Sequence, residues 1–227
     1  MLKYLREEEF LDALSNLIRK NKGEGTEVVS IVGGAGSGKT TLARKLIKAL
    51  GNADMLGTDD YVIGDRAYRR ANLEGGDPIK KYNPTKLNEH IAAIKNLDDS
   101  EKLGVPTYNE QTGEAVDAKE YTRQIGKVDF LVVEGDFDFV KGPDLLVYFD
   151  VPDEIRLANR IKRDLATRNV MDEAEIKESF DLRQRLQHLP YTLPTKSKAD
   201  VIVNVVIGAD GEYFYEMLSG TKMAVGL

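Results

Sequence analysis

The sequence predicts an α/β fold: a parallel five-stranded sheet core with helices on both faces, an Arg-rich helical lid and a C-terminal β-hairpin. Two observations predict the sheet. Short runs rich in Val, Ile and Leu recur along the chain, as in strands buried on both faces, and segments with helical spacing of apolar residues lie between them. Strands that alternate with helices pair in parallel. The expected strands are residues 28–32, 53–56, 129–134, 145–150 and 201–207.

The segments between and around these strands predict helices and turns. Residues 62–84 are polar and rich in Gly and Pro, and they predict a long functional loop. After the last strand, Asp210 and Gly211 can turn the chain back into a hairpin. The expected helices are residues 4–20, 41–50, 85–97, about 153–168 and about 172–187, and the returning arm of the hairpin is 212–217.

Composition restricts the classes of function. The chain has 227 residues, of which 41% are hydrophobic, enough for one domain with a proper core. The absence of cysteine excludes disulfides, thiolate catalysis and zinc–thiolate sites. A net charge of −6 disfavours nucleic acid and anionic membranes as partners, and no apolar run approaches the ~18 residues of a membrane span. Because the N-terminus lacks the apolar core of a signal peptide, we expect a cytoplasmic protein; a homo-oligomer is an open alternative to a monomer.

Residues 33–40 read Gly-Gly-Ala-Gly-Ser-Gly-Lys-Thr and fit the phosphate-loop pattern G-x-x-x-x-G-K-[ST], between a predicted strand and a predicted helix. In this context glycines let backbone N–H groups turn toward phosphate oxygens, and the helix N-terminus favours negative charge. Lys39 is expected to reach the β- and γ-phosphates and the Thr40 hydroxyl to hold Mg²⁺. The predicted cofactors are ATP, with GTP as the alternative, and Mg²⁺. The predicted nucleotide-binding residues are Gly33, Gly34, Ala35, Gly36, Ser37, Gly38, Lys39, Thr40 and Thr41.

Acidic residues follow two of the predicted strands. Asp59 and Asp60 follow the second strand, and Glu134 and Asp136 follow the third. Because ligands bind at the carboxyl ends of strands in such sheets, these carboxylates should face the phosphate loop. We expect Glu134 to hold Mg²⁺, directly or through water. We expect Asp59 to accept the proton of an attacking hydroxyl, with Asp60 as the second choice. Asp60 and Asp136 are more readily explained as structural.

A basic segment follows the fourth predicted strand. Arg156, Arg160 and Arg163 recur at a spacing that places them on one helix face, and Arg168 follows. In most proteins such a run is a solvated face. Beside a phosphate loop, arginines can instead stabilise the charge of a migrating phosphoryl group, and a helix pair that closes over it excludes water. We therefore predict a lid over about 156–190, in which Arg160 binds the nucleotide, and Arg163 and Arg168 act on the transferring group, Arg163 also contacting the substrate.

Several segments, taken in order, match a pattern known from one family of enzymes. They are GGAGSGKTTLA at 33–43, LGTDDY at 56–61, PTYN at 106–109, VVEG at 132–135, NRIKRDLATRN at 159–169 and KADVIVN at 198–204. With these segments the chain resembles the uridine kinase family of P-loop kinases, a group related to phosphoribulokinase and bacterial pantothenate kinase. The resemblance implies a single kinase domain over 1–227 that phosphorylates a hydroxyl of a small metabolite with ATP. It also implies that Asp59 is both base and metal partner, and that Tyr108 lies in the acceptor site.

The predicted acceptor-binding region, residues 62–113, departs from that family. The family's Asp-His-Pro segment is replaced by Tyr-Asn-Pro at 82–84, and Glu110 and Gly113 stand where nucleoside-using members carry the aromatic residue and the histidine that read the base. A nucleoside (uridine or cytidine) is therefore one alternative for the acceptor, and pantothenate or a sugar phosphate is the other. Basic side chains in the loop either hold such an anion or are merely solvated: Arg69, Arg70, Lys80 and Lys81.

Two further classes of function stay open from the sequence. A non-enzymatic NTP-binding switch protein would signal nucleotide occupancy to a partner, but such proteins usually carry Asp where this chain has Glu134, and they rarely need an arginine-rich lid. A phosphotransferase acting on a protein or an RNA end is the third class, and the acidic charge balance disfavours RNA. The two histidines, His90 and His188, are expected to be structural.

Overall fold

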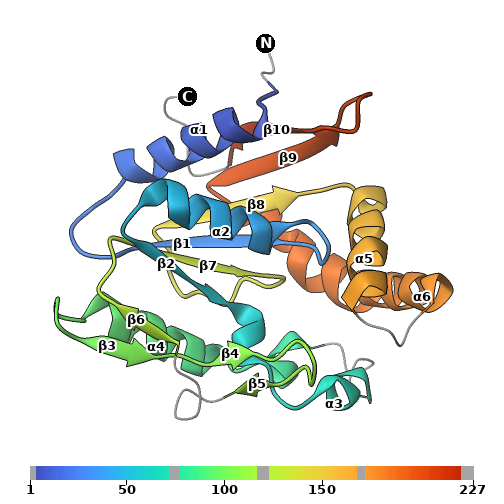
Figure 1. Ribbon diagram of the computed structural model, residues 1–227, viewed down its shortest axis with the longest axis horizontal. Coiled ribbons are helices and arrows are strands. Elements are labelled where there is room, and N and C mark those ends of the chain that lie inside the picture. The colour runs from blue at the N-terminus through green and yellow to red at the C-terminus, as the bar shows by residue number, and fades with distance from the viewer. Residues whose placement is uncertain (1–3, 72–76, 117–122, 168–171, 221–227) are drawn as a thin grey trace.

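One six-stranded sheet forms the centre of the computed structural model, which describes residues 4–71, 77–116, 123–167 and 172–220. The strand order is β10-β9-β8-β1-β7-β2. All neighbours pair in parallel except β10, which runs antiparallel to β9 as the second arm of a hairpin (Figure 1). The predicted parallel core and C-terminal hairpin are thus confirmed. The strands are β1 Glu27–Gly33, β2 Ala53–Gly57, β7 Phe130–Gly135, β8 Leu145–Asp150, β9 Val201–Ile207 and β10 Tyr213–Ser219.

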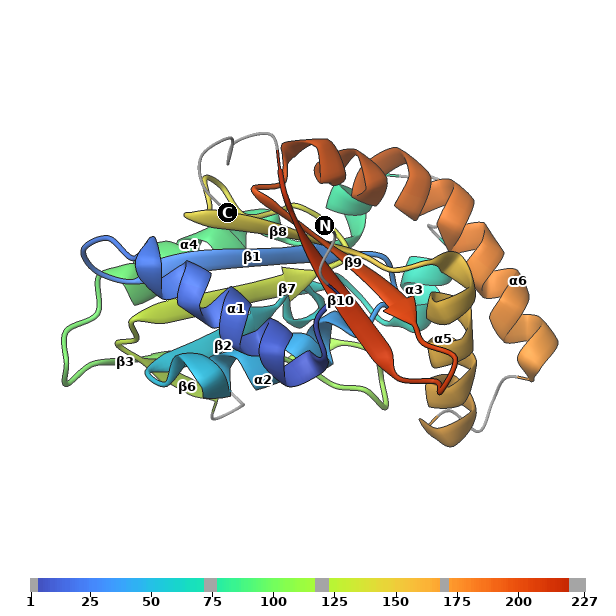
Figure 2. The same ribbon diagram turned by 90° about the horizontal axis from the view of Figure 1, so that it is seen from above.

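Helices cover both faces of this sheet, as expected (Figure 1 and Figure 2). On one face, α1 and α2 contribute Phe10 and Leu46 to a core cluster with Ile31 of β1. On the other face, α4 contributes Leu87 and Ile94 to a second cluster. Because both faces are covered, every residue of β1 is buried, which explains its continuous apolar sequence. The helices are α1 Glu7–Lys20, α2 Lys39–Leu50, α3 Arg66–Ala71, α4 Pro84–Lys95, α5 Asp153–Thr167 and α6 Glu173–Arg183.

Local signals set where the helices begin. α1 starts later than expected because Leu5 pairs with Tyr215 of β10 as an isolated β-bridge. α4 starts at Pro84, and the Asn83 side chain caps it by accepting a hydrogen bond from the Lys86 N–H at 3.0 Å. No helix within the described ranges combines the length and apolar character needed to span a membrane.

Three segments differ from the sequence-based expectation. The predicted loop 62–84 contains α3 and a 3-10 turn, Pro78–Lys81. The helix expected to reach about 187 is α-helical only to Arg183 and continues as a π-helical segment, Gln184–Thr192, within which Pro190 lacks the N–H of a regular helical hydrogen bond. Two ribbons, β3 with β6 and β4 with β5, pair only two or three residues each and leave no pattern in the sequence. Their strands are β3 Lys102–Gly104, β4 Thr107–Tyr108, β5 Ala115–Val116 and β6 Gln124–Gly126.

The carboxyl ends of β1, β7 and β8 point to the same end of the molecule, where α5 and α6 stand (Figure 1). This is the end at which parallel α/β sheets bind ligands.

Candidate active site

The glycine loop connects β1 to α2 and forms an open cradle. Gly36 and Gly38 have φ angles of 83° and 88°, a left-handed conformation that favours glycine. The Ser37 N–H donates to the Gly34 carbonyl at 3.1 Å, which closes the turn. Gly38 precedes α2 and has no side chain that could cap the helix, so the first N–H groups of α2 are left for a ligand. The loop therefore has the shape and polarity of an anion site.

Helix α5 packs directly against this loop. A Cβ atom at Gly34 would lie 2.0 Å from Nη1 of Arg156, and one at Gly36 would lie 2.3 Å from the Arg156 carbonyl oxygen. The Asn159 side chain donates to the Gly36 carbonyl at 3.1 Å. The contact with the backbone of α5 requires glycine at position 36, whereas at position 34 the Arg156 side chain would have to move. The packing fixes the base of the predicted lid to the phosphate loop.

Lys39 lies inside the cradle with only 6% of its surface exposed. Its Nζ donates to Asp136 Oδ1 at 2.8 Å and to the Gly34 carbonyl at 3.0 Å. Burial alone would raise the pKa of Asp136, but the charge and hydrogen bond of Lys39, together with the charges of Arg183 and Arg156, outweigh it and the pKa is lowered. Asp136 therefore holds the lysine ammonium where phosphate oxygens would otherwise lie.

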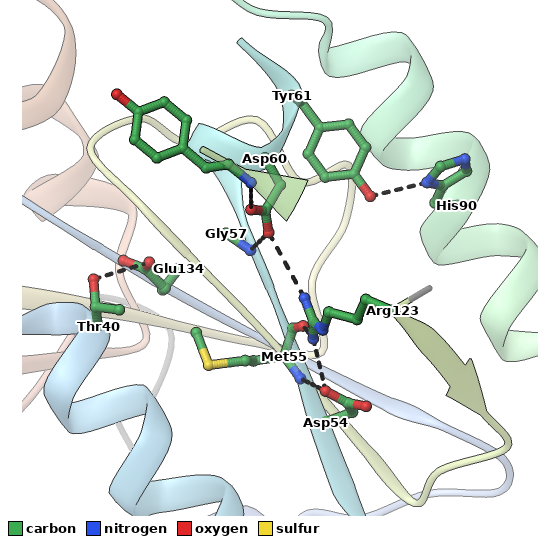
Figure 3. Close-up of polar contacts among 10 residues, drawn as sticks. Thr40, Asp54, Met55, Gly57, Asp60, Tyr61, His90, Arg123 and Glu134 are labelled. Atoms are coloured by element: carbon green, nitrogen blue, oxygen red, sulfur yellow. Dashed lines mark hydrogen bonds and ion pairs between the residues drawn. The ribbon is translucent and has the colours of Figure 1, made fainter. Parts of the chain in front are cut away.

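Thr40 and Glu134 meet at the start of α2. The Thr40 hydroxyl donates to Glu134 Oε1 at 3.0 Å, and Glu134 comes from the end of β7 (Figure 3). Burial is the main cause that raises the pKa of Glu134 to about 7, and the negative charge of Asp59 adds to it. The Thr40 hydroxyl and the buried Glu134 carboxylate together offer oxygen ligands that suit a hard divalent cation. The charge of such a cation would favour the ionised form of Glu134. These residues fit Mg²⁺.

The two neighbouring aspartates after β2 have different surroundings. Asp60 accepts the Gly57 and Tyr108 N–H groups at 3.0 and 2.8 Å, and so fastens β4 to the end of β2 (Figure 3). Asp59 instead accepts a hydrogen bond from the Tyr82 hydroxyl at 3.2 Å, and its side chain is open to solvent. Surrounding protein limits the hydration of the Asp59 carboxylate and raises its pKa, and the charge of Asp136 raises it further. Asp59 thus has the freer carboxylate of the two.

The resemblance predicts that Tyr108 lies in the acceptor site, and in the structure this residue contacts Arg69. Its hydroxyl is 3.4 Å from Nη2 of Arg69, and the Arg69 guanidinium carbon lies 5.9 Å from the centre of its ring. The expectation that His90 is structural also agrees with its surroundings, because its Nδ1 lies 3.0 Å from the Tyr61 hydroxyl (Figure 3).

The lid arginines are not equivalent. Arg160 is buried, bonds Ser179 at 2.9 Å, and its Nη1 has no hydrogen-bond partner among the described residues. Arg163 bonds Asp164 at 2.8 Å while its side chain is 51% exposed, away from the enclosed position expected of a group on the transferring phosphate. Arg168 lies outside the described residues.

Two residues of this region, Arg183 and Tyr82, were not predicted as site residues, and Lys81 was named only as one of four basic loop residues whose role stayed open. Arg183, at the end of α6, lines a small pocket between the lid and the loop together with Asp136 and Arg160. Tyr82 bonds Asp59, and Lys81 is buried beside it. The sequence does not indicate a site role for Arg183, because this residue lies outside the periodic run of arginines. Lys81 has the same sequence surroundings as a solvated loop residue. The Tyr-Asn-Pro sequence that replaces a family motif was the only indication of Tyr82.

A β-strand that runs into such a loop and then into a helix defines the class of P-loop nucleotide-binding proteins. Within that class the chain belongs to the phosphoribulokinase / uridine kinase family, whose family model matches residues 28–210. The predicted fold and family are thereby confirmed.

Individual relatives agree with this assignment. A uridine kinase from Borrelia duttonii (strain Ly) is 28% identical over 184 residues, which cover 78% of this chain and 85% of the relative. The phosphoribulokinase structure from Rhodobacter spheroides has a TM-score of 0.61 at 16% identity and covers 90% of this chain and 83% of that one. D-glycerate 3-kinase from Cryptococcus neoformans has a TM-score of 0.64 at 11% identity, covering 92% and 99%. At such identities the two structures support the fold alone.

Proposed function

We propose that this protein is an ATP-dependent kinase that transfers the γ-phosphoryl group to a hydroxyl of a small metabolite. One observation carries the proposal. The same edge of the sheet presents a phosphate loop and, after β2, a carboxylate on Asp59 that bonds a tyrosine hydroxyl instead of the backbone. Family membership supports the same conclusion, because the matched relatives are named kinases.

The loop would bind the nucleotide phosphates through its N–H groups and the N-terminus of α2. Lys39 would exchange its bond with Asp136 for phosphate oxygens, and Arg160 would offer its Nη1, which no other described residue bonds. Thr40 and Glu134 would hold Mg²⁺, with Asp59 as a further ligand. When bound, the ion would neutralise phosphate charge.

In the transfer step, the acceptor oxygen bonds the γ-phosphorus while the bond from that phosphorus to the β,γ-bridging oxygen breaks and ADP leaves. Asp59 accepts the hydroxyl proton, because its carboxylate bonds only the Tyr82 hydroxyl among the interactions described above. Lys39 would stabilise the charge on the transferring group. Catalytic roles for Arg163 and Arg168 stay predictions from the sequence.

The test is to incubate the protein with Mg²⁺, ATP labelled at the γ-phosphate and a panel of hydroxyl acceptors, and to follow the label. Transfer to a small molecule is the expected result. Label released only as inorganic phosphate, at a rate that a protein partner controls, would instead favour the NTP-binding switch.

A further inference from the structure

Three basic side chains gather on the acceptor side of the proposed active site. Lys81 ends the 3-10 turn that precedes Tyr82, and its side chain is only 2% exposed. Its Nζ has no hydrogen-bond partner within the part of the chain that the structure describes. A buried ammonium without a partner is costly, and such groups in native proteins require an explanation, such as an ion or ligand that is bound in the working state.

Neighbouring charges make this arrangement more costly still. Burial lowers the pKa of Lys81, and the positive charges of Arg183 and Arg69 lower it further, so the three cations lie within electrostatic reach of one another. The Arg183 side chain forms no hydrogen bond or ion pair with another described residue. The nearby acids are already engaged, because Asp136 bonds Lys39 and Asp59 bonds Tyr82.

The position of these cations relates them to the reacting hydroxyl. Tyr82, directly after Lys81, touches the proposed base, and Arg69 lies over Tyr108. Arg183 lines the pocket beside Asp136, and its charge acts on both Asp59 and Lys81. An acceptor whose hydroxyl meets Asp59 would therefore place a neighbouring group among the three cations.

We propose that Lys81, Arg69 and Arg183 bind an anionic group of the acceptor, so that the substrate is a hydroxylated carboxylate or phosphomonoester and not a neutral nucleoside. The inference rests on the proposed kinase function and names its substrate class. Of the four basic loop residues identified in the sequence, the structure separates Lys81 and Arg69 from Lys80, whose side chain is exposed; the side chain of Arg70 lies outside the described residues.

The test compares matched acceptors that differ only in charge: D-ribose 5-phosphate with D-ribose, D-glycerate with glycerol, and pantothenate with pantothenol, with uridine alongside. Binding is measured by thermal shift with Mg²⁺ and a non-hydrolysable ATP analogue, and turnover by ADP release. At least one anionic compound should bind ~10-fold or more tightly than its neutral partner, as expected for charge-assisted hydrogen bonds. If D-ribose 5-phosphate binds most tightly, the site takes a phosphomonoester; if D-glycerate or pantothenate does, the site takes a carboxylate. Equal binding within every pair, or a preference for uridine, overturns the inference.

Lys81→Met gives the second arm, with Lys80→Met as its matched control. Lys81→Met should weaken binding of the preferred anion ~10- to 100-fold and leave the affinity for the ATP analogue unchanged. Its ligand-free form should melt at the same temperature as the wild type or higher, because an unpaired buried charge is removed. Lys80→Met should change neither property. An unchanged anion preference in Lys81→Met contradicts the inference; Arg69→Gln repeats the comparison if Lys81→Met does not fold.

The two proposals can fail separately. If neutral acceptors are phosphorylated in preference, the kinase function survives and the anionic acceptor site does not. If anions bind through Lys81 but no acceptor is phosphorylated, the site survives and the kinase function does not.

Discussion

Adjacent residues with the same side chain have different roles in this site. Asp60 accepts two backbone N–H groups, one of them from Tyr108, 48 residues further along the chain, and lies 3.7 Å from Arg123 (Figure 3). Asp59 bonds only a tyrosine hydroxyl among the interactions described above. The sequence could place both carboxylates after β2, but it could not separate their roles, because the partners that decide them are distant in sequence.

This difference predicts opposite effects of two neighbouring substitutions. Asp60→Ala should lower the free energy of unfolding by about 2–4 kcal/mol, since two N–H groups lose their acceptor. Asp59→Ala should change it by less than about 0.5 kcal/mol or raise it. Urea unfolding of both variants measures this, and equal losses would contradict the roles assigned here.

His188 predicts a pH dependence of stability. Burial, followed by the positive charge of Arg156, lowers its pKa from 6.5 to about 4, and its Nδ1 has no hydrogen-bond partner among the described residues. The unfolded state therefore binds this proton more readily than the folded state, so stability falls as pH drops from about 6.5 toward 4. His188→Gln should flatten the dependence of unfolding free energy on pH in that window. An unchanged slope would show that His188 does not contribute.

At the scale of elements, the contact between α5 and the glycine loop joins the predicted lid to the phosphate loop. Gly36 carries two constraints, a φ angle of 83° and a hypothetical Cβ 2.3 Å from a backbone oxygen of α5. Gly211 has nearly the same φ angle, 82°, with nothing within 4 Å of a Cβ. A comparison of substitutions at the two glycines therefore separates the cost of backbone strain from the cost of close packing.

Gly211→Ala should lower the free energy of unfolding by about 1–2 kcal/mol, the cost of a left-handed alanine. Gly36→Ala should lower it further, because α5 must shift, and should weaken binding of an ATP analogue at least ~10-fold, or about 1.4 kcal/mol. Calorimetric titration and thermal unfolding of both variants provide the comparison. If the variants behave alike, the packing of α5 on the loop has no importance for nucleotide binding.

The same scale shows what the sequence could predict of the fold. The central strands were predictable because burial on both faces produces continuous apolar runs, as in β1 and β8, the latter predicted with its observed bounds. The ribbons β3–β6 and β4–β5 were not, because so few paired residues leave no periodic signal. Nor was the π-helical segment after Arg183, whose form depends on packing against the rest of the lid.

At the scale of the molecule, a chain with a net charge of −6 places several basic side chains beside the phosphate loop. Arg156, Arg160 and Arg183 line the pocket there. The lysine of the phosphate loop could be predicted from the loop motif, and the periodic arginines of the predicted lid could be predicted from their helical spacing. Lys81 was named among the basic loop residues, but the sequence could not separate it from the exposed Lys80, because burial decides the difference. Arg183 could not be predicted, because only the fold brings the end of α6 to the pocket beside the phosphate loop.

The kinase assignment depends most on the role of Asp59 as the proton acceptor. In Asp59→Asn the side chain keeps its size and can still accept the Tyr82 hydrogen bond, but it cannot take a proton from the acceptor. The decisive measurement is the rate of γ-phosphoryl transfer to the best acceptor for the wild type and Asp59→Asn, at saturating Mg²⁺ and ATP. If Asp59 is the proton acceptor, Asp59→Asn should lower kcat by ~10²- to 10⁴-fold and keep nucleotide affinity within about twofold of the wild type. Turnover by Asp59→Asn at near the wild-type rate would contradict this role.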